Sequence, residues 1–155
     1  MNDIQVVRYQ KRLENLFRQI GLLTDNLELQ SHGARYLCVL VSGFLEISIR
    51  SVYAAYAKDN SSPNVANFVE SHLERLQNPN MERIASLVGS FSPQWESDLR
   101  IATEGDLKDA VDSIVANRNK IAHGEDVGIT YARVQDYYRR IVRVLEYVER
   151  QCARS

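Results

Sequence analysis

The segment RYLCVLVSGFLEISIRSVYAAYA, residues 35–57, is the longest apolar stretch of the chain. Its apolar residues lie around most of the helical circumference, which is typical of a helix with neighbours on several sides. Arg35, Glu46 and Arg50 interrupt the stretch, so we interpret it as the central helix of a bundle and not as a membrane span. The remaining segments are then expected to supply the helices that pack around it.

Helical periodicity dominates on both sides of this segment. Residues 4–20 place apolar side chains on one helix face, at spacings of three and four residues. The segment from Thr130 to about Gln151 shows the same spacing, with an arginine-rich opposite face. No segment alternates apolar and polar residues as a half-buried strand would. The pattern therefore predicts an all-α fold.

Capping residues mark the shorter elements between these helices. Ser62-Pro63 predicts the start of a helix that runs to about Leu76, and Ser92-Pro93 predicts one through Ile101. Between them, Met81 to about Val88 reads as a short helix. Asp106 opens a further helix, which Gly124 is placed to end. We expect one domain over residues 1–155, built as a bundle of about five to seven helices.

Composition limits the classes of function that fit. The chain has 155 residues, of which 45% are hydrophobic and 25% charged, as in soluble globular proteins that bury a sizeable core. Its net charge of −1 provides no overall basic field, so an anionic ligand needs a local cluster of cations. The N-terminus lacks the apolar core of a signal peptide. Cys38 and Cys152 show no metal-ligand spacing, which favours a reduced, cytoplasmic protein without a metal or cofactor.

The sequence RNKIAH, residues 118–123, places a charge where its helix should present a core residue. On a helical wheel Arg118 lies in the middle of the apolar arc, which comprises Leu107, Val111, Ile114, Val115, Ile121 and Ala122. Asn119 and His123 are four residues apart and share one flank of this face, whereas Lys120 points to solvent. An unpaired buried charge costs several kcal/mol, so Arg118 must be paired or must face a wet cleft or a second subunit. The simpler alternatives are an arginine that snorkels out of the core and a histidine that merely caps the helix.

These residues resemble a known superfamily. The order arginine, polar residue and histidine in Arg118, Asn119 and His123 is similar to the signature of the HEPN superfamily. The segment VLVSGFLEISIRSVYAAYA resembles the second helix of its RiboL-PSP-HEPN subgroup, and its distance from RNKIAHG fits that subgroup. The resemblance implies an antiparallel helical bundle that pairs as a homodimer, so that two copies of the motif face one cleft.

The resemblance also implies a chemistry. Many HEPN domains are metal-independent ribonucleases of defence or toxin–antitoxin systems, so the expected partners are an RNA substrate, a second copy of the chain and an antitoxin protein, with no membrane. His123 would take the proton from the RNA 2′-hydroxyl, Arg118 would hold the phosphate, and Asn119 would orient His123 or bind a phosphate oxygen. The alternative is a non-catalytic HEPN module that binds a nucleotide, RNA or a protein.

Other residues carry weaker expectations. Glu46 either forms an i,i+4 ion pair with Arg50 or reaches the motif helix, where it would pair with Arg118 or orient His123. A possible track for RNA phosphates comprises Arg133, Arg140 and Lys120, although basic residues on a helix are usually just a solvated face. His32 and His72 are expected on the surface without partners.

Overall fold

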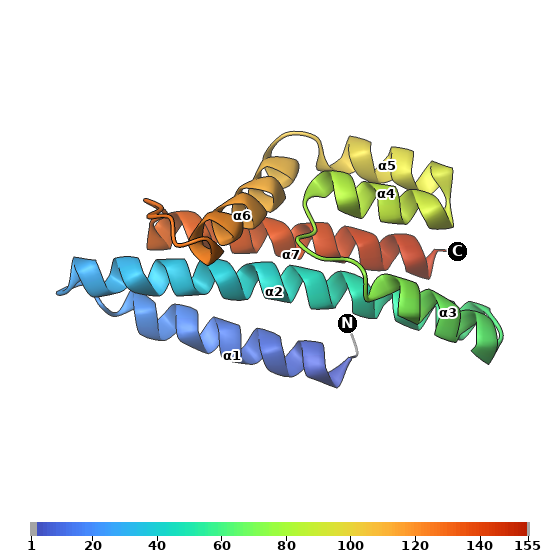
Figure 1. The fold of residues 1–155 in the computed structure, drawn as a ribbon, viewed down its shortest axis with the longest axis horizontal. Helices are drawn as coiled ribbons and strands as arrows, with labels where there is room; N and C mark the ends of the chain where they lie inside the picture. Colours follow the sequence, from blue (N-terminus) through green and yellow to red (C-terminus); the bar gives the residue numbers. More distant parts are fainter. Residues whose placement is uncertain (1–2, 155) are drawn as a thin grey trace.

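The structure is a computed structural model that describes residues 3–154, and over these residues it contains seven helices and no strand (Figure 1). The prediction of an all-α bundle is confirmed. In chain order the helices are α1 (Ile4–Gly21), α2 (Leu27–Asn60), α3 (Pro63–Leu73), α4 (Met81–Phe91), α5 (Pro93–Thr103), α6 (Asp106–Ala122) and α7 (Tyr131–Ala153).

Helix α2 runs through the middle of the bundle and packs against α1, α3, α6 and α7 (Figure 1). It has 34 residues, more than residues 35–57 suggested. The extra length begins at Asn26, whose side chain accepts a hydrogen bond from the amide of Leu29 and caps the helix. By length and apolar composition α2 contains a window able to cross a membrane, but 56% of that window is buried inside the bundle. This burial is typical of a core helix.

Aromatic rings join the three long helices. Phe17 of α1 and Phe44 of α2 lie 5.1 and 5.9 Å, between ring centroids, from Tyr138 of α7. Tyr138 is buried, and its hydroxyl donates to Glu14 and accepts from Gln10. Burial raises the pKa of Tyr138. These contacts fix α1 and α7 on neighbouring sides of α2.

Several boundaries differ from the prediction because contacts between helices decide them. Helix α3 ends at Leu73, and the Arg50 guanidinium donates to the carbonyl oxygens of Glu74 and Leu76 just beyond it. Helix α4 continues past Val88 to Phe91, whose ring stacks on that of Tyr53 at 5.0 Å. Ser92 then ends α4. The same residue caps the start of α5, as the Ser92-Pro93 pair predicted.

Helix α6 is fixed to the bundle along its first half. Its buried residues are Ala110, Val111, Ile114 and Val115. The Cys38 thiol donates to the carbonyl of Ile114 at 3.7 Å, and burial raises the pKa of Cys38 to about 12. The Asp112 carboxylate accepts from the amide of Met81, which ties α6 to the start of α4. Ile121 is half-buried and packs against the core, but Ala122 is exposed, so including Ala122 in the core was wrong.

Candidate functional site

The histidine of the motif closes α6. His123 is the C-cap, and Gly124 follows with a φ of +77°, a conformation that favours glycine. The amide of Gly124 donates to Ile121 at 3.0 Å, and the amide of Glu125 donates to Lys120 at 2.9 Å. Together these bonds form a Schellman motif. The sequence therefore ends the helix directly after His123 and fixes that residue on the last turn.

The arginine of the motif lines a small polar pocket at the surface. The pocket has a volume of about 210 Å³ and lies on α2, between α1 and α6. Arg118 forms one wall from α6 and Tyr9 forms the other from α1. The remaining lining residues are Val39, Leu40, Ser42, Gly43 and Glu46 of α2 and Asn78 of the turn before α4. Of the environments expected for Arg118, the structure therefore provides a small surface cleft.

Arg118 differs from the other half-buried arginines of the described residues. Arg35, Arg50 and Arg140 each have a carboxylate partner, which is respectively Asp126, Glu46 and Asp136. Arg118 has no carboxylate partner in residues 3–154 and makes one long hydrogen bond, 3.4 Å, to the side-chain oxygen of Asn119. Its remaining donors are available for an anion.

Glu46 fits both of its expected roles in part. Its carboxylate lies 3.8 Å from the Arg50 guanidinium, which is the i,i+4 ion pair that the spacing indicated. It also lines the same pocket as Arg118, although no hydrogen bond or ion pair joins these two side chains. The structure therefore brings Glu46 to the motif helix without pairing it there, and it does not place Glu46 beside His123.

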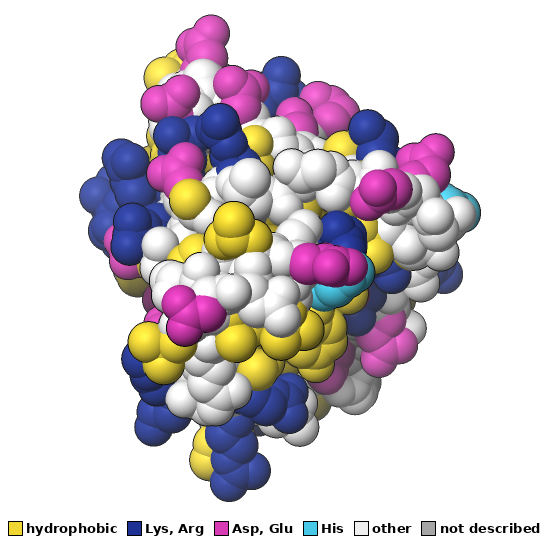
Figure 2. Space-filling model, turned by 90° about the vertical axis from the view of Figure 1, so that its left-hand side faces the viewer, with side chains coloured by type: hydrophobic (Ala, Val, Ile, Leu, Met, Phe, Trp, Pro, Cys, Tyr) yellow, Lys and Arg dark blue, Asp and Glu magenta, His cyan; other side chains and the backbone are white. Residues whose placement is uncertain are grey.

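His123 and Asn119 lie outside this pocket. Asn119 is half-buried and touches Arg118, whereas the His123 side chain is exposed and makes no hydrogen bond or ion pair within the described part of the chain. Figure 2 looks onto the end of the bundle at which α2 begins and shows basic, acidic, hydrophobic and histidine side chains on this surface. Within one chain, Arg118 and His123 do not share a pocket.

The weaker basic candidates do not join the site. Lys120 is exposed, as expected, but outside the pocket. Arg133 lies over the ring of Tyr137, with 5.9 Å from its guanidinium carbon to the ring centroid. Arg140 pairs with Asp136 at 3.0 Å. Both arginines belong to α7, which contributes no residue to the pocket.

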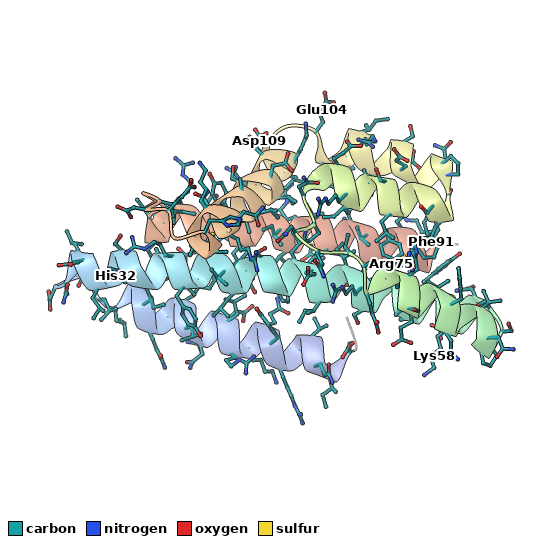
Figure 3. The ribbon with its side chains drawn as sticks, in the orientation of Figure 1. His32, Lys58, Arg75, Phe91, Glu104 and Asp109 are labelled. Carbon is teal, nitrogen blue, oxygen red and sulfur yellow. The ribbon has the colours of Figure 1, made fainter. Side chains whose placement is uncertain are left out.

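Sequence reasoning missed a second group of polar residues near the motif. His32 was expected to have no partner, which is wrong: its ring lies 3.9 Å from Glu28 and contacts the guanidinium of Arg35. Arg35 also lies 3.8 Å from Asp126, in the loop that follows His123. Figure 3 shows His32 near the start of α2. The Glu28–His32 spacing of four residues was the available signal for one of these contacts.

Comparison with known families gives the chain its class. The model of the RiboL-PSP-HEPN family matches residues 6–154. The chain therefore belongs to the RiboL-PSP-HEPN family, as the sequence motifs predicted. Membership supports a nuclease or an RNA-related module. Comparisons with curated proteins and with solved structures found no match.

Proposed function

We propose that the protein is a toxin-like, metal-independent endoribonuclease that acts as a homodimer. The observation that carries this proposal is Arg118, a half-buried guanidinium with no carboxylate partner that opens onto a polar pocket. A guanidinium is a planar set of donors that suits phosphate oxygens. A purely structural arginine in such a position is normally paired, as Arg35, Arg50 and Arg140 are here.

His123 supplies the second group that the reaction needs. Imidazole can accept a proton near neutral pH, and the exposed His123 ring is not engaged by another side chain of the described residues. With the 2′-hydroxyl deprotonated, its oxygen bonds to phosphorus and the bond from phosphorus to the 5′-oxygen breaks. The leaving oxygen takes a proton from water or from the second His123 of the dimer. The products are a 2′,3′-cyclic phosphate and a 5′-hydroxyl.

A homodimer would bring the two groups together. His123 of one copy could approach Arg118 of the other, because His123 is exposed and, within one chain, does not line the pocket that Arg118 opens onto. Exposed leucines support an interface at this end of the bundle: Leu22 and Leu27, at the turn between α1 and α2, are 79% and 72% exposed. Figure 2 shows hydrophobic side chains on the surface there. Burying them against a second copy would remove this apolar surface from water.

The proposal is tested by incubating the purified protein with RNA in EDTA. Wild type should cleave, whereas His123→Ala should reduce kcat/KM by about 10²–10⁴-fold, the range for loss of a general base. His72→Ala is the matched control, because His72 is an exposed histidine of α3 outside the pocket. A DNA strand of the same sequence should remain intact, since it lacks the attacking hydroxyl.

Each contrary outcome has a definite meaning. Cleavage that persists in His123→Ala would exclude the proposed base, and cleavage that stops in EDTA would exclude a metal-independent reaction. Tight RNA or nucleotide binding without any cleavage would favour the alternative, a non-catalytic HEPN module. For the toxin role, expression of wild type should stop growth and expression of His123→Ala should not. A protein encoded nearby that restores growth would be the expected antitoxin.

A further inference from the structure

The pocket beside Arg118 contains more polar groups than phosphate binding requires. Besides the arginine, its lining includes three residues with polar side chains, Glu46, Ser42 and Asn78. Convergent polar groups in one small pocket are the usual means by which a site selects among similar ligands. The ligand that would lie here, if Arg118 holds the phosphate of RNA, is a nucleobase next to that phosphate.

Ser42 adds a hydroxyl that other side chains leave free. The residue is 4% exposed and lines the pocket, and no hydrogen bond of its side chain occurs within residues 3–154. The side-chain amide of Asn78 likewise makes no hydrogen bond there, although the residue is half-buried. Both groups can donate and accept, so they are able to complement a polar heterocycle.

Glu46 determines which heterocycle fits. An ionised carboxylate offers only acceptors, two oxygens side by side, and so it matches two neighbouring N–H groups. The carboxylate lies 3.8 Å from the Arg50 guanidinium, and the bonds of Arg50 to the carbonyls of Glu74 and Leu76 hold that guanidinium in place. Among the four RNA bases, only guanine carries two adjacent donors, N1–H and the N2 amino group, on its Watson–Crick edge.

We propose that this pocket binds a guanine base of the RNA substrate, with Glu46 as the specificity-determining residue. The proposal rests on the proposed ribonuclease function and deepens it, because it names the nucleotide beside which the RNA is cut. Glu46 accepts from N1–H and N2–H, Ser42 and Asn78 complete the polar contacts, and Arg118 remains at the edge of the pocket for the phosphate. Tyr9 forms the aromatic wall, held by the hydrogen bond from its hydroxyl to the carbonyl of Leu40 at 2.7 Å.

Binding of nucleoside 3′-monophosphates tests this assignment without requiring catalysis. Wild type should bind guanosine 3′-monophosphate about tenfold or more tightly than the adenosine, cytidine and uridine compounds, the discrimination expected of one bidentate contact. Glu46→Gln replaces one acceptor with a donor and should bring the four affinities close together. Glu28→Gln is the control, since Glu28 is an exposed acid of α2 outside the pocket. Mapping of RNA cleavage sites should show cuts next to guanosine in wild type and a broader pattern in Glu46→Gln.

The outcomes separate this proposal from the one on which it rests. Equal binding of the four nucleotides by wild type would overturn it whether or not any variant folds, as would an unchanged guanine preference in Glu46→Gln. If RNA is cleaved without regard to base, the nuclease function stands and the guanine pocket fails. If the guanine compound is selected through Glu46 but RNA is not cut, the pocket stands and the nuclease function fails.

Discussion

The shape of the Arg118 pocket depends on one close approach, between Gly43 of α2 and Tyr9 of α1. A Cβ atom at position 43 would lie 2.6 Å from the Tyr9 hydroxyl oxygen but 3.6 Å from the nearest ring carbon. The first distance is a clash and the second is ordinary contact. Gly43→Ala should therefore displace the hydroxyl and break its hydrogen bond to the carbonyl of Leu40.

The size of the effect follows from two opposing terms. Loss of the hydrogen bond costs about 0.5–1.5 kcal/mol. Replacement of a glycine inside a helix by alanine contributes about 0.8–1.0 kcal/mol of stability. In wild type the two terms nearly cancel, so Gly43→Ala should change the free energy of unfolding only slightly. In a Tyr9→Phe background the clash is absent, and the same change should stabilise the protein by up to about 1 kcal/mol.

A double-mutant cycle measured by urea unfolding tests this reasoning. The four proteins (wild type, Gly43→Ala, Tyr9→Phe and the double variant) should be compared at one protein concentration, because unfolding of a dimer depends on concentration. The expected coupling between the two positions is about 1 kcal/mol. If Gly43→Ala has the same effect in both backgrounds within about 0.5 kcal/mol, the close approach does not shape the pocket as described.

Three further predictions concern the cap of α6, the cap of α1 and the site. Gly124→Ala should destabilise the protein by about 1–2 kcal/mol in urea unfolding, because the φ of +77° disfavours a side chain, and Gly124→Asn should cost less. Asp3→Ala should cost about 1 kcal/mol at neutral pH by removing the α1 cap. Hydrogen bonds from the Ser51 hydroxyl and the Gln5 amide lower the pKa of Asp3 in the folded protein from its usual 3.8. The stability that the Asp3 carboxylate contributes is therefore present above pH 3.8 and is lost as the pH falls through the lower pKa of the folded state. In acid, wild type and Asp3→Ala should become equally stable. Arg118→Ala should reduce RNA cleavage by about 10²–10³-fold. Because this change removes no ion pair, the free energy of unfolding of the variant should differ from that of wild type by less than about 1 kcal/mol.

Local signals explain why most of the fold could be predicted. The Ser92-Pro93 pair and Gly124 mark helix ends through the chemistry of the backbone nearby, and both ends are where the sequence placed them. Errors occur where distant residues decide the boundary. Arg50 binds carbonyls just beyond the end of α3, and Phe91 extends α4 by packing on Tyr53, so neither boundary can be read from its own segment.

The candidate site was predictable only in part, from the spacing within α6 and from Glu46 of α2. Spacing within α6 identified Arg118 as a charge at a core position, and the structure shows it half-buried in a pocket. The other walls come from Tyr9, Ser42 and Asn78, three separate segments whose convergence depends on how the helices cross. The helical wheel also placed Ala122 in the core, because a wheel gives direction around a helix but not where its neighbours end.

Mixing two inactive variants tests most directly whether Arg118 and His123 act on one phosphodiester across a dimer. Arg118→Ala and His123→Ala should each be inactive alone. A mixed dimer contains one site with both residues intact, so random exchange of subunits should restore about a quarter of wild-type cleavage. If both variants fold, form dimers and exchange subunits, yet the mixture remains inactive, the shared site does not exist.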